Sequence, residues 1–277
     1  MSDPAARHRP SPALTAIAVA FVVAGASVGA ATLKPESLVG WTAYVAATER
    51  RLANERGVSA RFLGVDFEQD ATTRRGQILA GKVLIEEVAP ATDNGRSIDV
   101  ASALVHDWRG AVFIPGVSLD HLLSGLQSAV PPQDDVLQSS ILERTPEYLT
   151  VFLRLRRSKV VSVIYNTEHR VRFERISPAR AASESTATKI AEVADANTPK
   201  EHELTSDDDH GYLWRWNAYW RYEQVQGGVI AECESVSLSR ELPLTLIFLR
   251  PIVNGTAQES MARTLLAVKK AYLGAGD

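Results

Sequence analysis

The chain has 277 residues, of which 45% are hydrophobic and 23% charged, with a net charge of −3 at pH 7 and a single cysteine, Cys233. This balance, with a pI near 6.1, argues against a nucleic-acid partner, which would need a basic surface. One cysteine excludes an internal disulfide, and a chain of this length buries enough surface to fold without one.

The first 30 residues have the pattern of a secretory signal peptide. Arg7 and Arg9 give a basic start, an uncharged apolar run covers 13–23, and Val28-Gly29-Ala30 places small residues before a cleavage site. An uncleaved membrane anchor is the alternative, because the uncharged stretch continues to Leu33 and approaches the ~20 residues of a bilayer span. Glycine and serine weaken its second half and favour cleavage. We therefore expect an exported protein, periplasmic or secreted.

A helix is predicted over 36–56, where apolar residues recur at spacings of three and four. A strand is predicted over 77–88. The segment 90–95 reads Pro-Ala-Thr-Asp-Asn-Gly and is a turn or linker by composition. We take it as the boundary between an N-terminal extension over 31–95 and a main domain over 96–277.

The main domain begins with a strand and a short helix that Ser118 caps. A run of strands follows, and a closing helix extends from Pro243 onward. The alternation of apolar and polar residues along the strands indicates an antiparallel sheet with one covered face. We therefore predict an α+β fold in which a curved sheet wraps around the C-terminal helix. The predicted strands cover 103–114, 136–144, 147–157, 160–175, 180–193, 212–224 and 229–239.

This order of elements resembles the START-like superfamily, the SRPBCC or helix-grip group that includes polyketide cyclases and lipid-transfer proteins. The resemblance covers about 98–273 and includes the aromatic run from Gly211 to Tyr222, which looks like the penultimate strand of exported bacterial members of unassigned function. It implies a cavity between sheet and helix that often holds an apolar ligand. The superfamily shares no catalytic residues, so the resemblance implies no catalytic site and no cofactor.

The aromatic strand is the most distinctive feature of the sequence. Its large side chains have even numbers, so they are expected on one face of the strand, which either lines a ligand cavity or packs as ordinary core. The odd-numbered face is expected to be solvated. The even-numbered aromatics are Tyr212, Trp214, Trp216, Trp220 and Tyr222, and the odd-numbered residues are Arg215, Asn217, Tyr219, Arg221 and Glu223.

His169 and Tyr165 share the apolar face of their strand. His169 either orients a polar ligand group or is hydrogen-bonded within a core. The candidate ligand-binding residues are Trp214, Trp216, Trp220, Tyr222, Tyr165 and His169. We predict no metal site, because the acidic tract 207–209 lacks the further ligands of a calcium loop. Cys233 alternates with apolar residues and is expected to be buried.

These features predict a protein that binds a lipid or another apolar small molecule without chemistry. One alternative is a cyclase-like or hydrolase-like enzyme that uses His169 and Tyr165 in the same cavity. A third possibility is an envelope protein that binds a partner through the helix over 36–56, which would then expose a large apolar patch.

Overall fold

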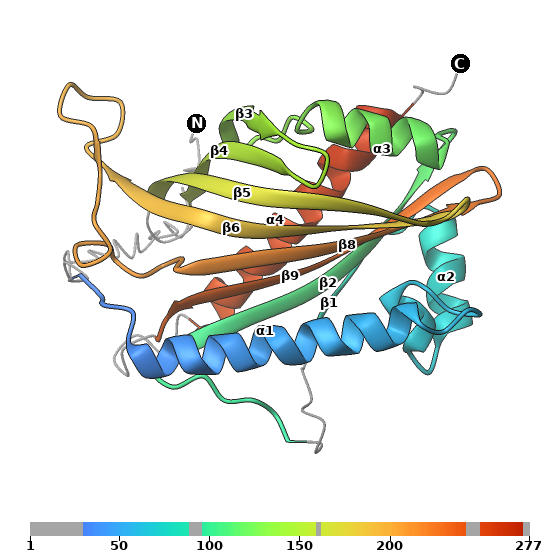
Figure 1. Cartoon of the computed structure of the whole chain (residues 1–277), viewed down its shortest axis with the longest axis horizontal. Coiled ribbons are helices and arrows are strands. Elements are labelled where there is room, and N and C mark those ends of the chain that lie inside the picture. The colour runs from blue at the N-terminus through green and yellow to red at the C-terminus, as the bar shows by residue number, and fades with distance from the viewer. Residues whose placement is uncertain (1–29, 89–95, 159–161, 242–249, 274–277) are drawn as a thin grey trace, which may run out of the picture.

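The computed structural model describes residues 30–88, 96–158, 162–241 and 250–273. A curved antiparallel sheet forms its middle layer, with one long helix across each face (Figure 1). Nine strands of the described chain make the sheet, in the order β1-β2-β9-β8-β6-β5-β4-β3, with β7 paired to β6. The predicted signal peptide, apart from Ala30, and the predicted linker over 90–95 lie outside the described residues.

The predicted strands of the main domain and the helix that Ser118 caps are confirmed with small shifts of their ends. The closing helix is confirmed from Arg250, and its predicted start over 243–249 lies outside the described residues. The helices are α1 (Pro35–Arg56), α2 (Ala71–Leu79), α3 (Leu119–Ser128) and α4 (Arg250–Tyr272), with a 3-10 turn η1 (Gly64–Phe67). The strands are β1 (Leu84–Glu87), β2 (Ala103–Pro115), β3 (Val136–Arg144), β4 (Leu149–Ser158), β5 (Ser162–Ser177), β6 (Arg180–Ala194), β7 (His202–Glu203), β8 (Arg215–Val225) and β9 (Gly228–Arg240).

The strand predicted over 77–88 is wrong in its first half. Residues 71–79 form α2, whose buried residue is Ile78, and only 84–87 form a strand. Gly81 separates the two with a φ of +95°, a left-handed conformation that glycine adopts without strain. A short apolar run interrupted by glycine has no clear period, so helix and strand could not be told apart by pattern.

We call the face of the sheet toward α4 the inner face. Met261, Leu265 and Val268 of α4 pack there in one cluster with Trp108 of β2 and Tyr222 of β8. α3 adds its apolar stripe to the same cluster, and Ser118 accepts a hydrogen bond from the backbone N–H of His121 as the predicted cap. The predicted curved sheet around a C-terminal helix is confirmed.

α4 approaches β2 most closely at Gly110. A Cβ at this glycine would lie 2.6 Å from Cδ1 of Leu265 and 2.9 Å from Cγ of Met261, so a larger residue would force these side chains to move. On its other side α4 reaches the segment before β3, where Arg263 Nε donates to Asp135 Oδ2 at 3.2 Å. The helix is therefore seated on β2 and tied to the opposite end of the curved sheet.

We call the opposite side of the sheet the outer face, and the N-terminal extension covers much of it. Trp41, Tyr44 and Leu52 of α1 pack with residues of β8 and β9, including Tyr219 and Val236. β1, from the same extension, pairs antiparallel with β2 and adds a strand to the sheet edge. The extension thus covers one face of the sheet and also lengthens the sheet by one strand.

This cover makes one prediction wrong, that the odd-numbered face of the aromatic strand is solvated. Asn217, Tyr219, Arg221 and Glu223 are only 7%, 6%, 4% and 7% exposed. They lie on the outer face beneath α1 and the segment that follows it. Polar composition indicated solvent, but here polar side chains are buried against polar partners.

Candidate functional site

The outer face carries buried charges that are paired with the N-terminal extension. Arg221 of β8 donates to Glu55 of α1 at 2.5 Å and to the carbonyl of Phe62 at 2.7 Å. Glu232 of β9 accepts hydrogen bonds from two backbone N–H groups of η1, Gly64 and Val65. These ion pairs and hydrogen bonds join the extension to the outer face of the sheet, and each buried charge has a partner.

A second part of this interface contains two close carboxyl groups. Tyr44 of α1 donates to Asp107 Oδ2 of β2 at 3.0 Å, and Arg51 pairs with Glu234 of β9. Asp107 Oδ1 and Glu234 Oε2 are buried without hydrogen-bond partners, as is Thr48 Oγ1. Burial, and next the neighbouring charge of Glu234, raise the pKa of Asp107 well above its usual range. The charged form of Asp107 is therefore less favoured in the folded state than in water.

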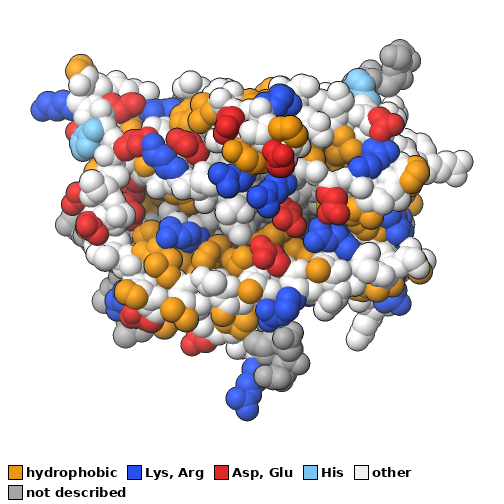
Figure 2. Space-filling view, in the orientation of Figure 1, with side chains coloured by type: hydrophobic (Ala, Val, Ile, Leu, Met, Phe, Trp, Pro, Cys, Tyr) orange, Lys and Arg blue, Asp and Glu red, His pale blue; other side chains and the backbone are white. Residues whose placement is uncertain are grey.

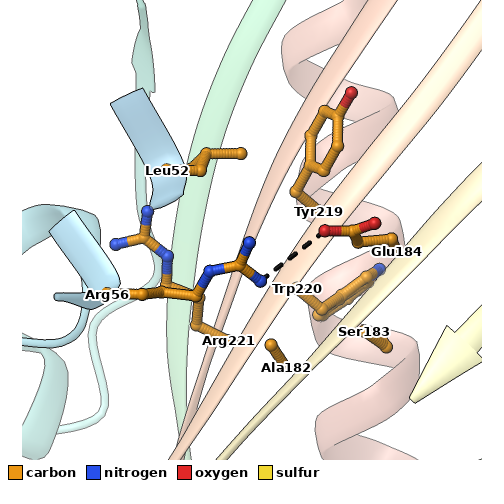
Figure 3. A pocket seen from close by; sticks show the side chains of 8 residues that line it. All are labelled: Leu52, Arg56, Ala182, Ser183, Glu184, Tyr219, Trp220 and Arg221. Atoms are coloured by element: carbon orange, nitrogen blue, oxygen red, sulfur yellow. Dashed lines mark ion pairs between the residues drawn. The ribbon is translucent and has the colours of Figure 1, made fainter. Parts of the chain in front are cut away.

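The outer face is hollowed between α1 and the strands β5 and β6 (Figure 2). A pocket there is lined by α1, β6 and β8, and Arg56 faces Glu184 across it at 3.6 Å (Figure 3). Its free volume is about 10 Å³, which is room for about one water molecule. This pocket is too small for an organic ligand.

The inner face presents a different surface beside α4. Six of its side chains lie in the central strands β6, β8 and β9 and yet remain partly accessible. Accessible surface in the middle of a sheet means that water-sized space lies over these residues, because direct packing by a helix would bury them. We call this set the inner patch: Ser185, Trp216, Ala218, Trp220, Ser235 and Ser237.

The position of α4 explains why the inner patch is accessible. Met261, Leu265 and Val268 belong to the cluster that includes Trp108, Val112 and Ile114 of β2. α4 packs chiefly on β2, and less on β1 and β9. Trp220 and Ala218 only border this cluster. The seat of the helix at one side of the sheet thus leaves the surface of β8 and β6 incompletely covered.

Hydrogen bonds within the inner face hold Trp216 and two of the three serines of the patch, Ser185 and Ser235. Trp216 Nε1 donates to Ser235 Oγ at 2.9 Å. His169 lies against Trp216 with its ring edge-on, at a centroid distance of 4.9 Å. Nε2 of His169 lies 3.0 Å from Thr167 Oγ1, and its Nδ1 lies 3.4 Å from Ser185 Oγ. Burial lowers the pKa of His169 to about 4, so this imidazole is neutral at pH 7.

The candidate residues do not all lie together. Trp216 and Trp220 belong to the inner patch, and Tyr222 stacks on Trp220 at 5.9 Å and is buried. Tyr165 and His169 lie on the same face but are buried, at 3% and 4% exposure. They border the accessible surface without forming it.

Trp214 faces the other way, and the expectation that it shares a face with Trp216 is wrong. Its ring packs in the outer-face cluster with Trp41, and its Nε1 donates to Asp209 at 3.2 Å. β8 begins only at Arg215, and Gly211 just before it has a φ of +71°. Strict alternation therefore does not extend back to residue 214.

Trp108 was not recognised from the sequence. Its side chain lies on the inner face, and its Nε1 is buried without a hydrogen-bond partner. The hydroxyl of Tyr165 is in the same state. Buried polar groups are usually hydrogen-bonded, so two buried donors without partners on the same face are unusual. The alternation along 103–114 could have placed Trp108 there.

Comparisons with known proteins return structural likenesses alone. No family model matches the chain, and no curated protein matches it. A STAR-related lipid transfer protein from Xanthomonas axonopodis is 17% identical, with a TM-score of 0.43 over 63% of this chain and 95% of that one. The lipid transfer and protein localization domain of human StarD13 is 7% identical, with a TM-score of 0.42 over 75% of this chain and 98% of that one.

An aromatase/cyclase from Streptomyces, Zhui, is 12% identical, with a TM-score of 0.37 over 61% of this chain and 93% of that one. Likenesses at this level concern layout and say nothing of ligand or activity. The order of strands and helices described above is itself the START-like order, and the predicted resemblance is confirmed for the fold.

Within the described ranges, no group of three or more His, Cys, Asp or Glu side chains is arranged to hold a metal ion. None of the helices described here has the length and apolar character to span a membrane. Cys233 is buried on the inner face as predicted, and burial raises the pKa of its thiol. α1 turns its large apolar side chains toward the sheet, and only Val39 among them is strongly exposed, at 72%.

Proposed function

We propose that this protein binds a lipid or another apolar small molecule on the inner face of the sheet, beside α4. The observation that supports the proposal is the inner patch, where Trp216, Ala218 and Trp220 of a central strand remain accessible next to a hydrophobic core. Ligand sites are concave and largely apolar, with a few polar groups that orient the ligand. In the inner patch the aromatic rings provide the apolar surface, and the serine hydroxyls provide the polar groups.

A binding role without chemistry fits the surroundings of His169 better than catalysis does. The ring is buried, is neutral at pH 7 and is engaged at both nitrogens. A general acid or base works best with a pKa near the operating pH and within reach of the substrate. His169 is therefore assigned to hold Thr167, Ser185 and Trp216 in place.

The test is to measure ligand that stays with the protein after purification from its own compartment. Organic extraction and mass spectrometry should find a bound molecule in the wild type, and Ser237→Trp should reduce it at least about tenfold by filling the patch. Thr186→Trp is the matched control, because Thr186 is exposed on the outer face of β6. An empty wild-type extract, or equal ligand in both variants with native circular dichroism, contradicts the proposal.

We also propose that the protein is exported by a cleaved signal peptide at residues 1–30. The basic start, uncharged run and small residues before Ala31 support this. N-terminal sequencing of the mature protein should begin at or near Ala31. A mature chain that still begins at Met1 contradicts cleavage and leaves a membrane anchor.

A further inference from the structure

The charged residues of β8 and β9 lie on one face of the sheet. On the inner face, β8 carries Trp216, Ala218, Trp220 and Tyr222, and β9 carries Cys233, Ser235 and Ser237. None of these side chains is charged. The outer face of the same two strands carries Arg221, Glu223, Glu232 and Glu234. The sequence thus places charges against the extension and keeps them away from the inner patch.

The inner patch has spare hydrogen-bonding capacity at one end. Ser235 Oγ accepts from Trp216, which leaves its own hydroxyl hydrogen free to donate. In the described part of the chain, no side-chain hydrogen bond involves Ser237, which pairs with Trp216 across the strands. His169 brings no charge to this end, because it is neutral at pH 7. His106 of β2 pairs with Ser237 from the other side; it is buried, and its Nε2 lies 2.9 Å from Ser239 Oγ.

The other end of the inner patch is aromatic. Trp220 pairs with Cys233 on one side and with Ser183 on the other, and Ser183 pairs with Phe173 of β5. Trp216 and Trp220 are four residues apart in one strand, which corresponds to about 13 Å. The patch therefore has a polar end and an apolar end separated by the length of a small amphipathic molecule.

Resting on the proposed function, this arrangement defines the kind of ligand. We propose that the inner patch binds an uncharged amphipathic molecule, such as an alcohol, ester, ketone or phenol, with its polar group against Ser235 and Ser237 and its apolar part against Trp220. A hydroxyl or carbonyl group is satisfied by serine partners. A carboxylate or ammonium group would lose much of its hydration there without an opposite charge among the described patch residues.

The test uses three probes with the same ten-carbon chain: 1-decanol, decanoate and decyltrimethylammonium. Isothermal titration at pH 7.5 should give a dissociation constant for decanol at least about tenfold lower than for either ion. Ser237→Lys should improve decanoate binding about tenfold by supplying a counter-charge. Thr186→Lys adds the same charge on the outer face and should leave all three constants unchanged.

A measurement on the wild type alone covers the case in which Ser237→Lys does not fold. Lowering the pH from 7.5 to 5.5 increases the neutral fraction of decanoic acid, so its apparent affinity should rise. Decanoate binding as tight as decanol binding, or an affinity independent of pH, overturns the neutral-ligand proposal and leaves the binding function standing. If none of the probes binds, the neutral-ligand proposal falls, and an empty extract from purified protein overturns the binding function as well.

Discussion

The two faces of one sheet are built by different rules in this protein. The outer face buries paired charges, such as Arg221 with Glu55, beneath the N-terminal extension. On β8 and β9 the inner face has aromatic, small and neutral polar side chains, and part of it stays accessible. The comparison shows that polar character does not identify the open face here. On these two strands the charged side is covered by the extension, and the uncharged side stays partly accessible.

The largest effect is expected from breaking the outer face at Arg221. Arg221→Ala leaves Glu55 with Arg51 as its one remaining charged partner and removes a positive charge beside the buried Glu232. It should lower the free energy of unfolding by about 3–5 kcal/mol in urea titrations. Arg172→Ala is the control, because Arg172 is exposed in β5, and a change within about 0.5 kcal/mol is expected. A loss below about 1 kcal/mol in Arg221→Ala would show that the buried pair does not hold the extension.

A second test compares how titratable groups on the two faces make stability depend on pH. The first of these groups is His169 on the inner face. Its folded pKa of about 4 lies below the usual 6.5, so between these values the unfolded chain binds a proton that the folded chain does not. The free energy of unfolding should therefore fall by about 3 kcal/mol as the pH drops from 6.5 to 4. His169→Gln should flatten this slope, and identical slopes in both proteins would contradict the assignment.

Asp107 on the outer face should make the free energy of unfolding change with pH in the opposite direction. Its substitution should give the smallest change in stability of the three. Its folded pKa is raised, so stability is lost as the pH rises from about 4 through that pKa. Asp107→Asn keeps an acceptor for Tyr44 and removes the charge, so it should be about 1–2 kcal/mol more stable than the wild type at pH 8. The free energies of unfolding of the two proteins should become equal near pH 4. Asp120→Asn, at an exposed ion pair, serves as the control and should change little.

Period-two alternation was enough to place most of the strands, and it put Trp216, Trp220 and Tyr222 on the α4 side correctly. It failed where strand geometry stops, as at Trp214, and where a short run lacks a period, as over 77–88. The burial of Arg221 could not be predicted, because its partner Glu55 is 166 residues away in the chain. Local patterns show that a residue is polar, but they do not show what covers it.

The alternation of faces along β8 has a consequence for how this protein can change. Even-numbered positions such as Trp216 and Trp220 face the inner patch, and odd-numbered positions such as Arg221 and Glu223 hold the outer interface. Under the proposed function, substitutions at the first set change which molecule is bound, while the second set keeps its contacts with the extension. Insertion or deletion of one residue in this strand would exchange the two sets, so new specificities can arise by replacement and not by changes in strand length.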